Sequence, residues 1–164
     1  MRTFLDKNRI AGFIIYPLGD LIAQIIWGEV NGVRIVTMAL AGGLIYAFEI
    51  PLYFGWINRT FNHWFPRTLA AIAYFNPLWI ARHIFLIRAS LNPPTILTWP
   101  SLSVLLHTSW ISGLSSFTGA IVISFAGNYI IQNMIPLERR FIASSIFSGL
   151  MAVYYAISEA FLKG

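Results

Sequence analysis

Several ionisable and amide side chains lie inside long apolar stretches of this sequence, and these are the residues that could do chemistry. The ionisable ones are Asp20, Glu49, Arg82, His83, His107 and Glu159, and the amides are Gln24, Asn76, Asn128 and Gln132. A charge at the centre of a bilayer costs roughly 2.5–3.5 kcal/mol on insertion scales, so such residues mark functional sites by default. Our candidates for a polar pathway or a substrate-binding site are Asp20, Gln24, Glu49, Asn76, Arg82 and His83.

The spacing of these residues suggests how they could act together. Asp20 lies near the middle of the first apolar stretch and shares a helix face with Gln24, four residues later. Glu49 shortly precedes Pro51, and Asn76 directly precedes Pro77. Each proline removes a backbone donor and frees a carbonyl. Two proline-interrupted helices with polar side chains are what a polar cavity or pathway would require.

A structural interpretation of the same residues stays open beside the functional one. Arg82 could neutralise Asp20 or Glu49 and lock the helices together as an ion pair. His83 and His107 could be neutral residues that only donate or accept hydrogen bonds. Glu159 lies close to the end of an apolar stretch, where its carboxylate could reach water.

Enzyme templates find less support. The sequence has no H-E-x-x-H pair, G-x-S-x-G elbow, phosphate loop or dinucleotide fingerprint. It has no cysteine, which removes disulfides and thiolate chemistry. Asp20 and Glu49 could do acid–base work, and His83 with His107 could ligate a haem. An enzyme or cofactor protein built on these residues is therefore the alternative; we expect no cofactor and no metal.

Composition indicates the elements that must position these side chains. Of the 164 residues, 57% are hydrophobic and 10% are charged, against roughly a quarter charged in a soluble domain. A chain of this length cannot hide so much apolar surface by folding in water. The excess must face lipid, so we predict a single all-α integral membrane domain over residues 1–164. The net charge of +5 comes from short connections and not from a basic face, so no nucleic-acid partner is expected.

About 20 apolar residues are needed to cross the hydrocarbon core. Five spans are predicted, with four to six possible: Ile10–Trp27, Ile35–Ile57, Thr68–Ile87, Ile111–Ile131 and Phe141–Leu162. The first resembles a signal peptide, but no small-x-small cleavage site follows it, so we expect a retained helix. Pro100 suits a first helical turn, which predicts a short interfacial or re-entrant piece over Ser101–Trp110.

Basic residues predict the orientation. Seven lie on the side of the N-terminus: Arg2, Lys7, Arg9, Arg59, Arg67, Arg139 and Arg140. Three lie on the opposite side: Arg34, Arg88 and Lys163. The seven-to-three bias places the N-terminus in the cytoplasm, or in the matrix of an organelle.

Two further patterns concern the helix ends and the helix contacts. Tryptophans fall at or near the predicted ends, where their rings favour the headgroup zone: Trp27, Trp56, Trp64, Trp99 and Trp110. Small residues recur four apart and predict close helix packing, with a homo-oligomer face as the alternative: Ala39/Gly43/Ala47, Ser115/Gly119 and Ser145/Gly149.

The segment around Gly19, Asp20 and Gln24 resembles the peroxisomal membrane protein family, which includes a mitochondrial inner-membrane member with channel-like properties. Pro51 with Trp56 is similar to the proline and aromatic pair of the family's second helix. Ile135-Pro136 with Arg140 is similar to its late Val-Pro and arginine. The family's Asp-Gln pair before its third-helix proline is absent, since Ala71 and Ile72 occupy that place. The family is also usually drawn with four spans.

A weaker resemblance is to the bacterial alanine exporter family, through its size and Phe75 with Pro77. From the polar residues and the first resemblance we predict a small channel or transporter for a polar solute or ion. A bacterial inner membrane is the expected location, with an organelle inner membrane as alternative. A structural or assembly subunit of a membrane complex is the third class.

Overall fold

The computed structural model describes the backbone of residues 2–162 and the side chains of residues 6–154 and 157. Over these residues the chain is helical apart from short connections, and no strand occurs within them. Five continuous helical stretches follow one another: residues 2–27, 32–60, 64–91, 99–133 and 140–162. The prediction of an all-α bundle is confirmed.

The first two stretches form a helical hairpin. Helix α1 (Arg2–Trp27) contains Pro17 and stays α-helical across it. The second stretch consists of α2 (Gly32–Leu40), the π-helical segment η1 (Ala41–Tyr46) and α3 (Ala47–Thr60). The wider π turn gives the backbone slack in a helix that also has to accommodate a proline.

The third stretch repeats this plan. Helix α4 (Trp64–Ala73) is followed by the π-helical segment η2 (Tyr74–Leu78), which contains Pro77, and by α5 (Trp79–Leu91). A short 3-10 turn, η3 (Pro93–Ile96), then leads to the fourth stretch.

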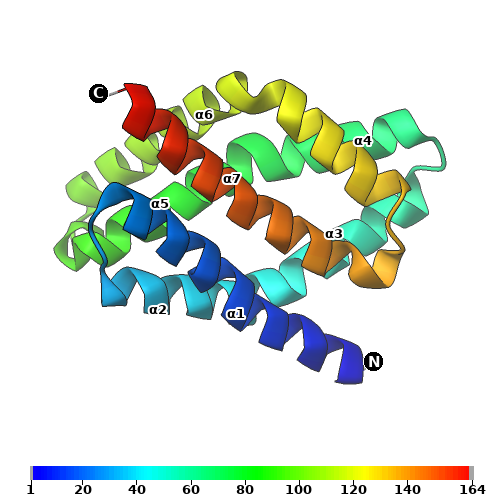
Figure 1. The fold of residues 1–164 in the computed structure, drawn as a ribbon, viewed down its shortest axis with the longest axis horizontal. Helices are drawn as coiled ribbons and strands as arrows, with labels where there is room; N and C mark the ends of the chain where they lie inside the picture. The colour runs from blue at the N-terminus through cyan, green and yellow to red at the C-terminus, as the bar shows by residue number, and fades with distance from the viewer. Residues whose placement is uncertain (1, 163–164) are drawn as a thin grey trace. The chain divides into compact units, whose positions relative to one another are not determined.

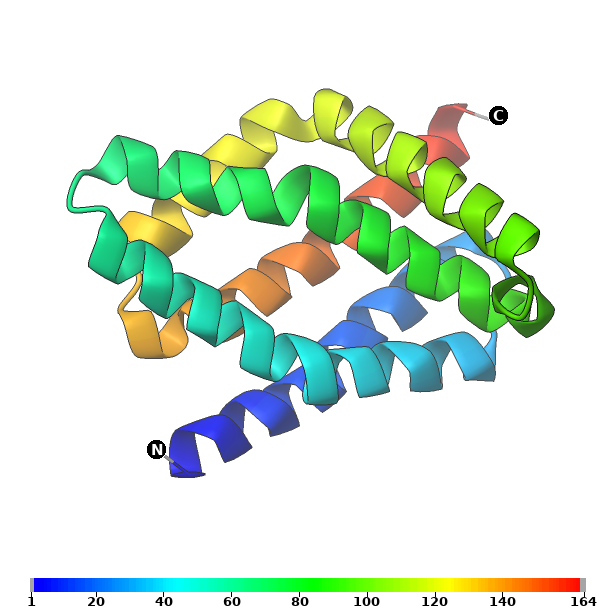
Figure 2. The same ribbon diagram turned by 180° about the vertical axis from the view of Figure 1, so that it is seen from behind.

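Helix α6 (Trp99–Asn133) corrects one prediction. Its 35 residues are continuous, so Ser101–Trp110 is no separate interfacial or re-entrant piece. Pro100 does lie in the first turn, but no later proline interrupts the helix. At 1.5 Å per residue the helix is ~52 Å long, well over the hydrocarbon thickness. Its middle part is bent (Figure 2), and that part contains Gly113 and Gly119, a residue type at which helices bend.

The last helix, α7 (Arg140–Leu162), follows the 3-10 turn η4 (Leu137–Arg139). Glu159, a sequence candidate, lies outside the residues whose side chains the structure describes. Among the described residues, four helical stretches are long and apolar enough to cross a membrane: Asp6–Trp27, Gly32–Thr60, Trp64–Leu91 and Trp99–Asn133. All four are longer than the corresponding spans predicted from the sequence.

The chain divides into two compact units. Unit 1 is residues 1–55 and 135–164, and unit 2 is residues 56–134. The expectation of one domain over 1–164 stays a prediction, and each unit is described by itself.

In unit 1, small residues let helix backbones touch. Helix α1 runs against α2 and η1 in the opposite direction and along α7 in the same direction (Figure 1). A Cβ added to Gly12 would lie 2.2 Å from the carbonyl oxygen of Gly42. One added to Gly19 would lie 2.8 Å from the Cα of Gly149. The contact at Gly149 confirms the predicted role of Ser145/Gly149 in packing α7.

In unit 2, α6 packs against α4, η2 and α5. The helices approach closely at Gly113, where an added Cβ would lie 2.8 Å from the backbone nitrogen of Ala81. The predicted pair Ser115/Gly119 is exposed, and a Cβ on Gly119 would meet nothing within 4 Å. The small residue at which α6 packs closely within this unit is therefore Gly113, and not Gly119 as expected.

The tryptophans largely follow the predicted interfacial pattern. Trp27 ends α1, Trp64 begins α4 and Trp99 begins α6, and all three are exposed. Trp110 is the exception, because α6 begins well before it. Its exposed ring lies well inside α6 and does not mark the start of that helix.

Candidate functional site

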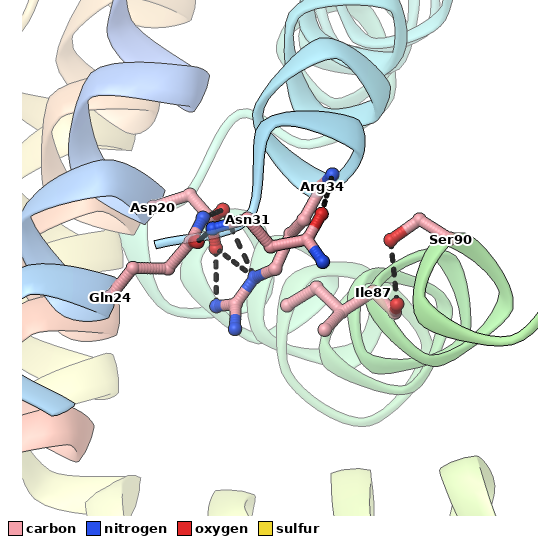
Figure 3. A network of polar contacts seen from close by, with 6 residues as sticks. All are labelled: Asp20, Gln24, Asn31, Arg34, Ile87 and Ser90. Atoms are coloured by element: carbon pink, nitrogen blue, oxygen red, sulfur yellow. Dashed lines mark hydrogen bonds and ion pairs between the residues drawn. The ribbon is translucent and has the colours of Figure 1, made fainter. Parts of the chain in front are cut away.

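The main charged site joins Asp20 of α1 to Arg34 of α2. The Arg34 Nε donates to both carboxylate oxygens of Asp20, at 2.9 and 3.0 Å, and its Nη2 donates to Oδ1 at 2.5 Å. Asp20 is 2% exposed and the Arg34 side chain 22%. Figure 3 shows the guanidinium facing the carboxylate from the neighbouring helix. Hydrogen bonds from a charged donor to a charged acceptor, with this fork geometry, are the strongest class in proteins.

Two amides complete the network (Figure 3). Gln24 Nε2 donates to Asp20 Oδ2 at 2.6 Å, as their shared helix face predicts. The Gln24 Oε1 accepts from the backbone N–H of Asn31 at 2.6 Å, and the Asn31 side chain accepts from the backbone N–H of Arg34 at 3.1 Å. Asp20 and Gln24 are both buried. Both carboxylate oxygens of Asp20 accept hydrogen bonds, and the Gln24 amide uses its nitrogen as a donor and its oxygen as an acceptor.

The sequence between the helices sets this geometry. Gly28 adopts a φ of 80° after α1 ends, and the N–H of Glu29 bonds back to the carbonyl of Gln24 at 3.2 Å. This is a Schellman end, which reverses the chain. Asn31 then caps α2 by accepting from the N–H of Arg34. A tight reversal between two capped helices brings Asp20 and Arg34 together.

This arrangement favours the structural interpretation of Asp20. Its partner is Arg34, where the sequence suggested Arg82. Because α1 already begins at Arg2, Asp20 lies two turns before the end of the helix at Trp27, and not near its middle. A neutralised, hydrogen-bonded carboxylate clamps the α1–α2 turn. Whether Asp20 and Gln24 also line a pathway stays a prediction.

Asn76 has a different environment. It lies in the π segment η2, directly before Pro77, close to the midpoint of the Trp64–Leu91 helix. The residue is 4% exposed, and its Nδ2 has no hydrogen-bond partner among the residues that the structure describes. Most buried polar groups in proteins are paired, so an amide donor left open in mid-helix calls for an explanation.

Other uncharged polar groups are buried in unit 2. Asn128 Nδ2 donates to the carbonyl of Ser124 at 2.9 Å, and Asn133 Nδ2 donates to Thr68 Oγ1 at 3.0 Å. Ser109, 1% exposed, has no partner for its Oγ among the described residues. Near the other end of the unit, Arg88 donates to Ser112 Oγ at 2.9 Å. Helix α6 thus presents a row of polar and small residues to the helices it packs against.

Of the remaining candidates, Arg82 and His83 are neighbours in α5, and Glu49 and His107 lie in other helices. Arg82 Nη2 is 3.4 Å from the Tyr74 hydroxyl, and the His83 ring stacks on Trp79 with centroids 4.8 Å apart. Glu49 is half-buried in the first turn of α3. His107 is exposed on α6. Within the described residues no three His, Asp or Glu side chains gather as a metal site.

The structure adds three residues to those chosen from the sequence. Arg34 and Asn31 fall between the first two predicted spans, although Asn31 stands where a helix cap is expected. Asn8 is 1% exposed, and neither end of its amide has a partner among the described residues. Asn8 was not chosen from the sequence, because it lies near the charged N-terminus and the first span was predicted to begin only at Ile10.

Comparisons with known proteins identify no relative: no family model, no curated protein and no solved structure matches this chain. The class that the fold defines is therefore the broad one, a helical protein with membrane-spanning helices.

Proposed function

We propose that this protein is a small channel or transporter, and that a polar solute or ion interacts with Asn76 on its way through the membrane. The observation that carries the proposal is the open Nδ2 of Asn76, buried in a π-helical segment at mid-helix. Its donor suits a solute that presents a hydrogen-bond acceptor, such as a carbonyl or carboxylate oxygen.

Energetics favour a ligand or water at this position. A buried donor without a partner costs about 1–3 kcal/mol, and apolar lipid provides no substitute partner. A polar solute or pathway water would remove that cost at Asn76. A leucine at the same position would remove it without any solute, so the presence of an amide needs a reason beyond packing.

The backbone around Asn76 gives further support. Pro77 withholds the N–H that would have bonded to the carbonyl of Ala73, and π segments are frequent at functional sites. In transporters, interrupted helices near the midplane supply backbone groups to the substrate site. The η1 segment lies near the midpoint of the Gly32–Thr60 helix in the same way.

The resemblance to the peroxisomal membrane protein family implies a channel-like role and belongs to the proposal. So does the location, a bacterial inner membrane or, as the alternative, an organelle inner membrane. The lipid bilayer and a small polar solute are the proposed partners.

One observation favours a second candidate, a structural or assembly subunit. The Asp20–Arg34 site is charged and conspicuous, yet its hydrogen bonds are satisfied within the protein. A protein whose buried polar groups only join helices would look like this part of unit 1.

Flux from reconstituted vesicles separates the two candidates. Ions, amino acids and small metabolites are loaded in turn, and flux is normalised to folded protein. Asn76→Leu should lower flux severalfold and keep the melting temperature. The matched control is Asn128→Leu, because the Asn128 amide donor already has a partner in Ser124. This variant should lower the melting temperature and leave the flux per folded protein close to that of wild type. Absence of flux with every solute, or equal flux for Asn76→Leu and wild type, would favour the assembly subunit.

A further inference from the structure

Four basic residues gather at one end of unit 1. Lys7 and Arg9 lie near the start of α1, and Arg139 and Arg140 lie where α7 begins. Helices α1 and α7 run in the same direction in both views (Figures 1 and 2). Their close contact at Gly19 and Gly149 holds them side by side, so these four residues share one end of the unit.

Arg9 is the best placed of the four to hold an anion. Its guanidinium carbon lies 5.8 Å from the centroid of the Phe48 ring, which keeps the side chain against α3. Its Nε is buried and has no hydrogen-bond partner among the described residues. The Phe48 ring thus holds the Arg9 side chain in place, and the Nε of Arg9 has a hydrogen-bond donor to offer.

The acidic residues at this end do not cancel the cluster. Asp6 and Glu138 are exposed neighbours in sequence of Lys7 and Arg139, and Glu49 lies one residue after Phe48. Against these three stand the four basic residues of the cluster, so the net charge at this end stays positive. Arg140 is 5% exposed, and its Nε donates to the carbonyl of Ile135 at 2.9 Å, which fixes the first turn of α7.

The two helical stretches beside the basic end also carry exposed apolar side chains within unit 1. Ile10 and Ile14 of α1 and Leu44 and Leu52 of the second helical stretch are exposed. Phe48, beneath Arg9, is exposed on the same stretch. A basic end followed by exposed apolar surface matches a molecule with an anionic head and acyl chains.

We infer that this end of unit 1 binds the phosphate headgroup of an anionic phospholipid, with Arg9 as the central contact and Lys7 and Arg139 at its rim. Clusters of basic residues next to membrane helices bind anionic headgroups in this way. The site lies on the side that the basic residues assign to the cytoplasm or matrix, where anionic lipids attract positive charge. It is independent of any solute site at Asn76.

The test uses the full chain in an uncharged detergent, titrated with phosphatidylglycerol, phosphatidylcholine or inorganic phosphate. Bound lipid is counted by native mass spectrometry, and the melting temperature is followed in parallel. Phosphatidylglycerol should bind and raise the melting temperature, and phosphatidylcholine should do neither. Arg9→Gln should weaken phosphatidylglycerol binding about fivefold, the contribution of one basic residue near an anionic surface.

The controls decide between the sources of the phosphate. Arg88→Gln, at the far end of α5, should bind phosphatidylglycerol like wild type. If Arg9→Gln fails to fold, exposed Lys7→Gln and Arg139→Gln take its place with the same expectation. Equal binding of both lipids, or equal losses for Arg9→Gln and Arg88→Gln, would overturn the inference. Competition by inorganic phosphate over the lipid's own concentration range would show a free-phosphate site and overturn the assignment to lipid.

Discussion

Arg34 holds the carboxylate of Asp20 through its Nε and Nη2 across the turn between the first two helices. The two residues lie 14 positions apart, with the left-handed Gly28 and the helix cap Asn31 between them. The contact therefore depends on the geometry of the whole turn, and it fixes the register of α1 against α2.

Replacing Arg34 should destabilise the protein. Removing one partner of a buried ion pair costs roughly 3–5 kcal/mol, and the partial exposure of Arg34 reduces this to about 2–3 kcal/mol. Arg34→Leu should therefore lower the melting temperature in detergent clearly more than Arg88→Leu, which loses a bond to a serine hydroxyl. Equal melting temperatures would mean that water replaces Arg34 at little cost. Asp20→Asn combined with Arg34→Gln should lose less than the sum of the single changes.

A methyl group at Gly12 should also be costly. It would lie 2.2 Å from a backbone oxygen of Gly42, so α1 and η1 would have to separate. Overpacking of this kind costs about 1–3 kcal/mol. Gly119→Ala is the matched control, because its methyl group meets nothing within 4 Å and alanine favours the helix. Thermal unfolding of both variants in one detergent is the measurement, and a Gly12→Ala variant as stable as wild type would contradict the close contact.

The turn glycine can be tested separately from the ion pair. Gly28→Ala places a side chain at a φ of 80°, which should cost about 1 kcal/mol. Gly32→Ala, four residues on and with open space around it, should change stability little. The comparison is made by unfolding in detergent, and two equal values would show that the α1 cap does not need glycine.

The predicted orientation is tested by labelling single cysteines, since the natural chain has none. Asn62 and Asn92 are exposed in two successive connections, so one helical stretch separates them. In intact cells an impermeant thiol reagent should label a cysteine at position 92 and spare one at 62. Labelling of position 62 from outside would reverse the orientation.

Much of the fold could be predicted from the sequence, because an apolar segment long enough to cross a bilayer indicates a helix by its length alone. The ends were harder: α1 begins at Arg2, since a helix continues through Lys7 and Arg9 once their backbone bonds are made, and hydropathy does not detect this. The continuity of α6 was missed for the opposite reason. Its uncharged length suggested two pieces, yet nothing after Pro100 stops the helix.

The candidate residues were found by polarity, but their partners were not. Asp20 and Gln24 were paired correctly, because they lie one helical turn apart. Arg34 was not identified as their partner, since that contact depends on the turn at Gly28 and not on a helical period. Asn8 was not selected as a candidate, because it lies where charged and polar residues are expected. Only the packed structure shows that it is buried.

The central claim is that Asn76 lies on a polar pathway, and the accessibility of that position to water tests it most directly. Cysteines are introduced singly at Asn76, at Ala71 in the buried part of α4 and at Leu78 on the exposed side of η2. The reconstituted proteins are treated with a small, charged, water-soluble thiol reagent. The account predicts that the cysteine at 76 reacts, that those at 71 and 78 do not, and that a transported solute slows the reaction at 76. An unreactive cysteine at 76 in folded protein, or one that reacts no faster than that at 71, would contradict it.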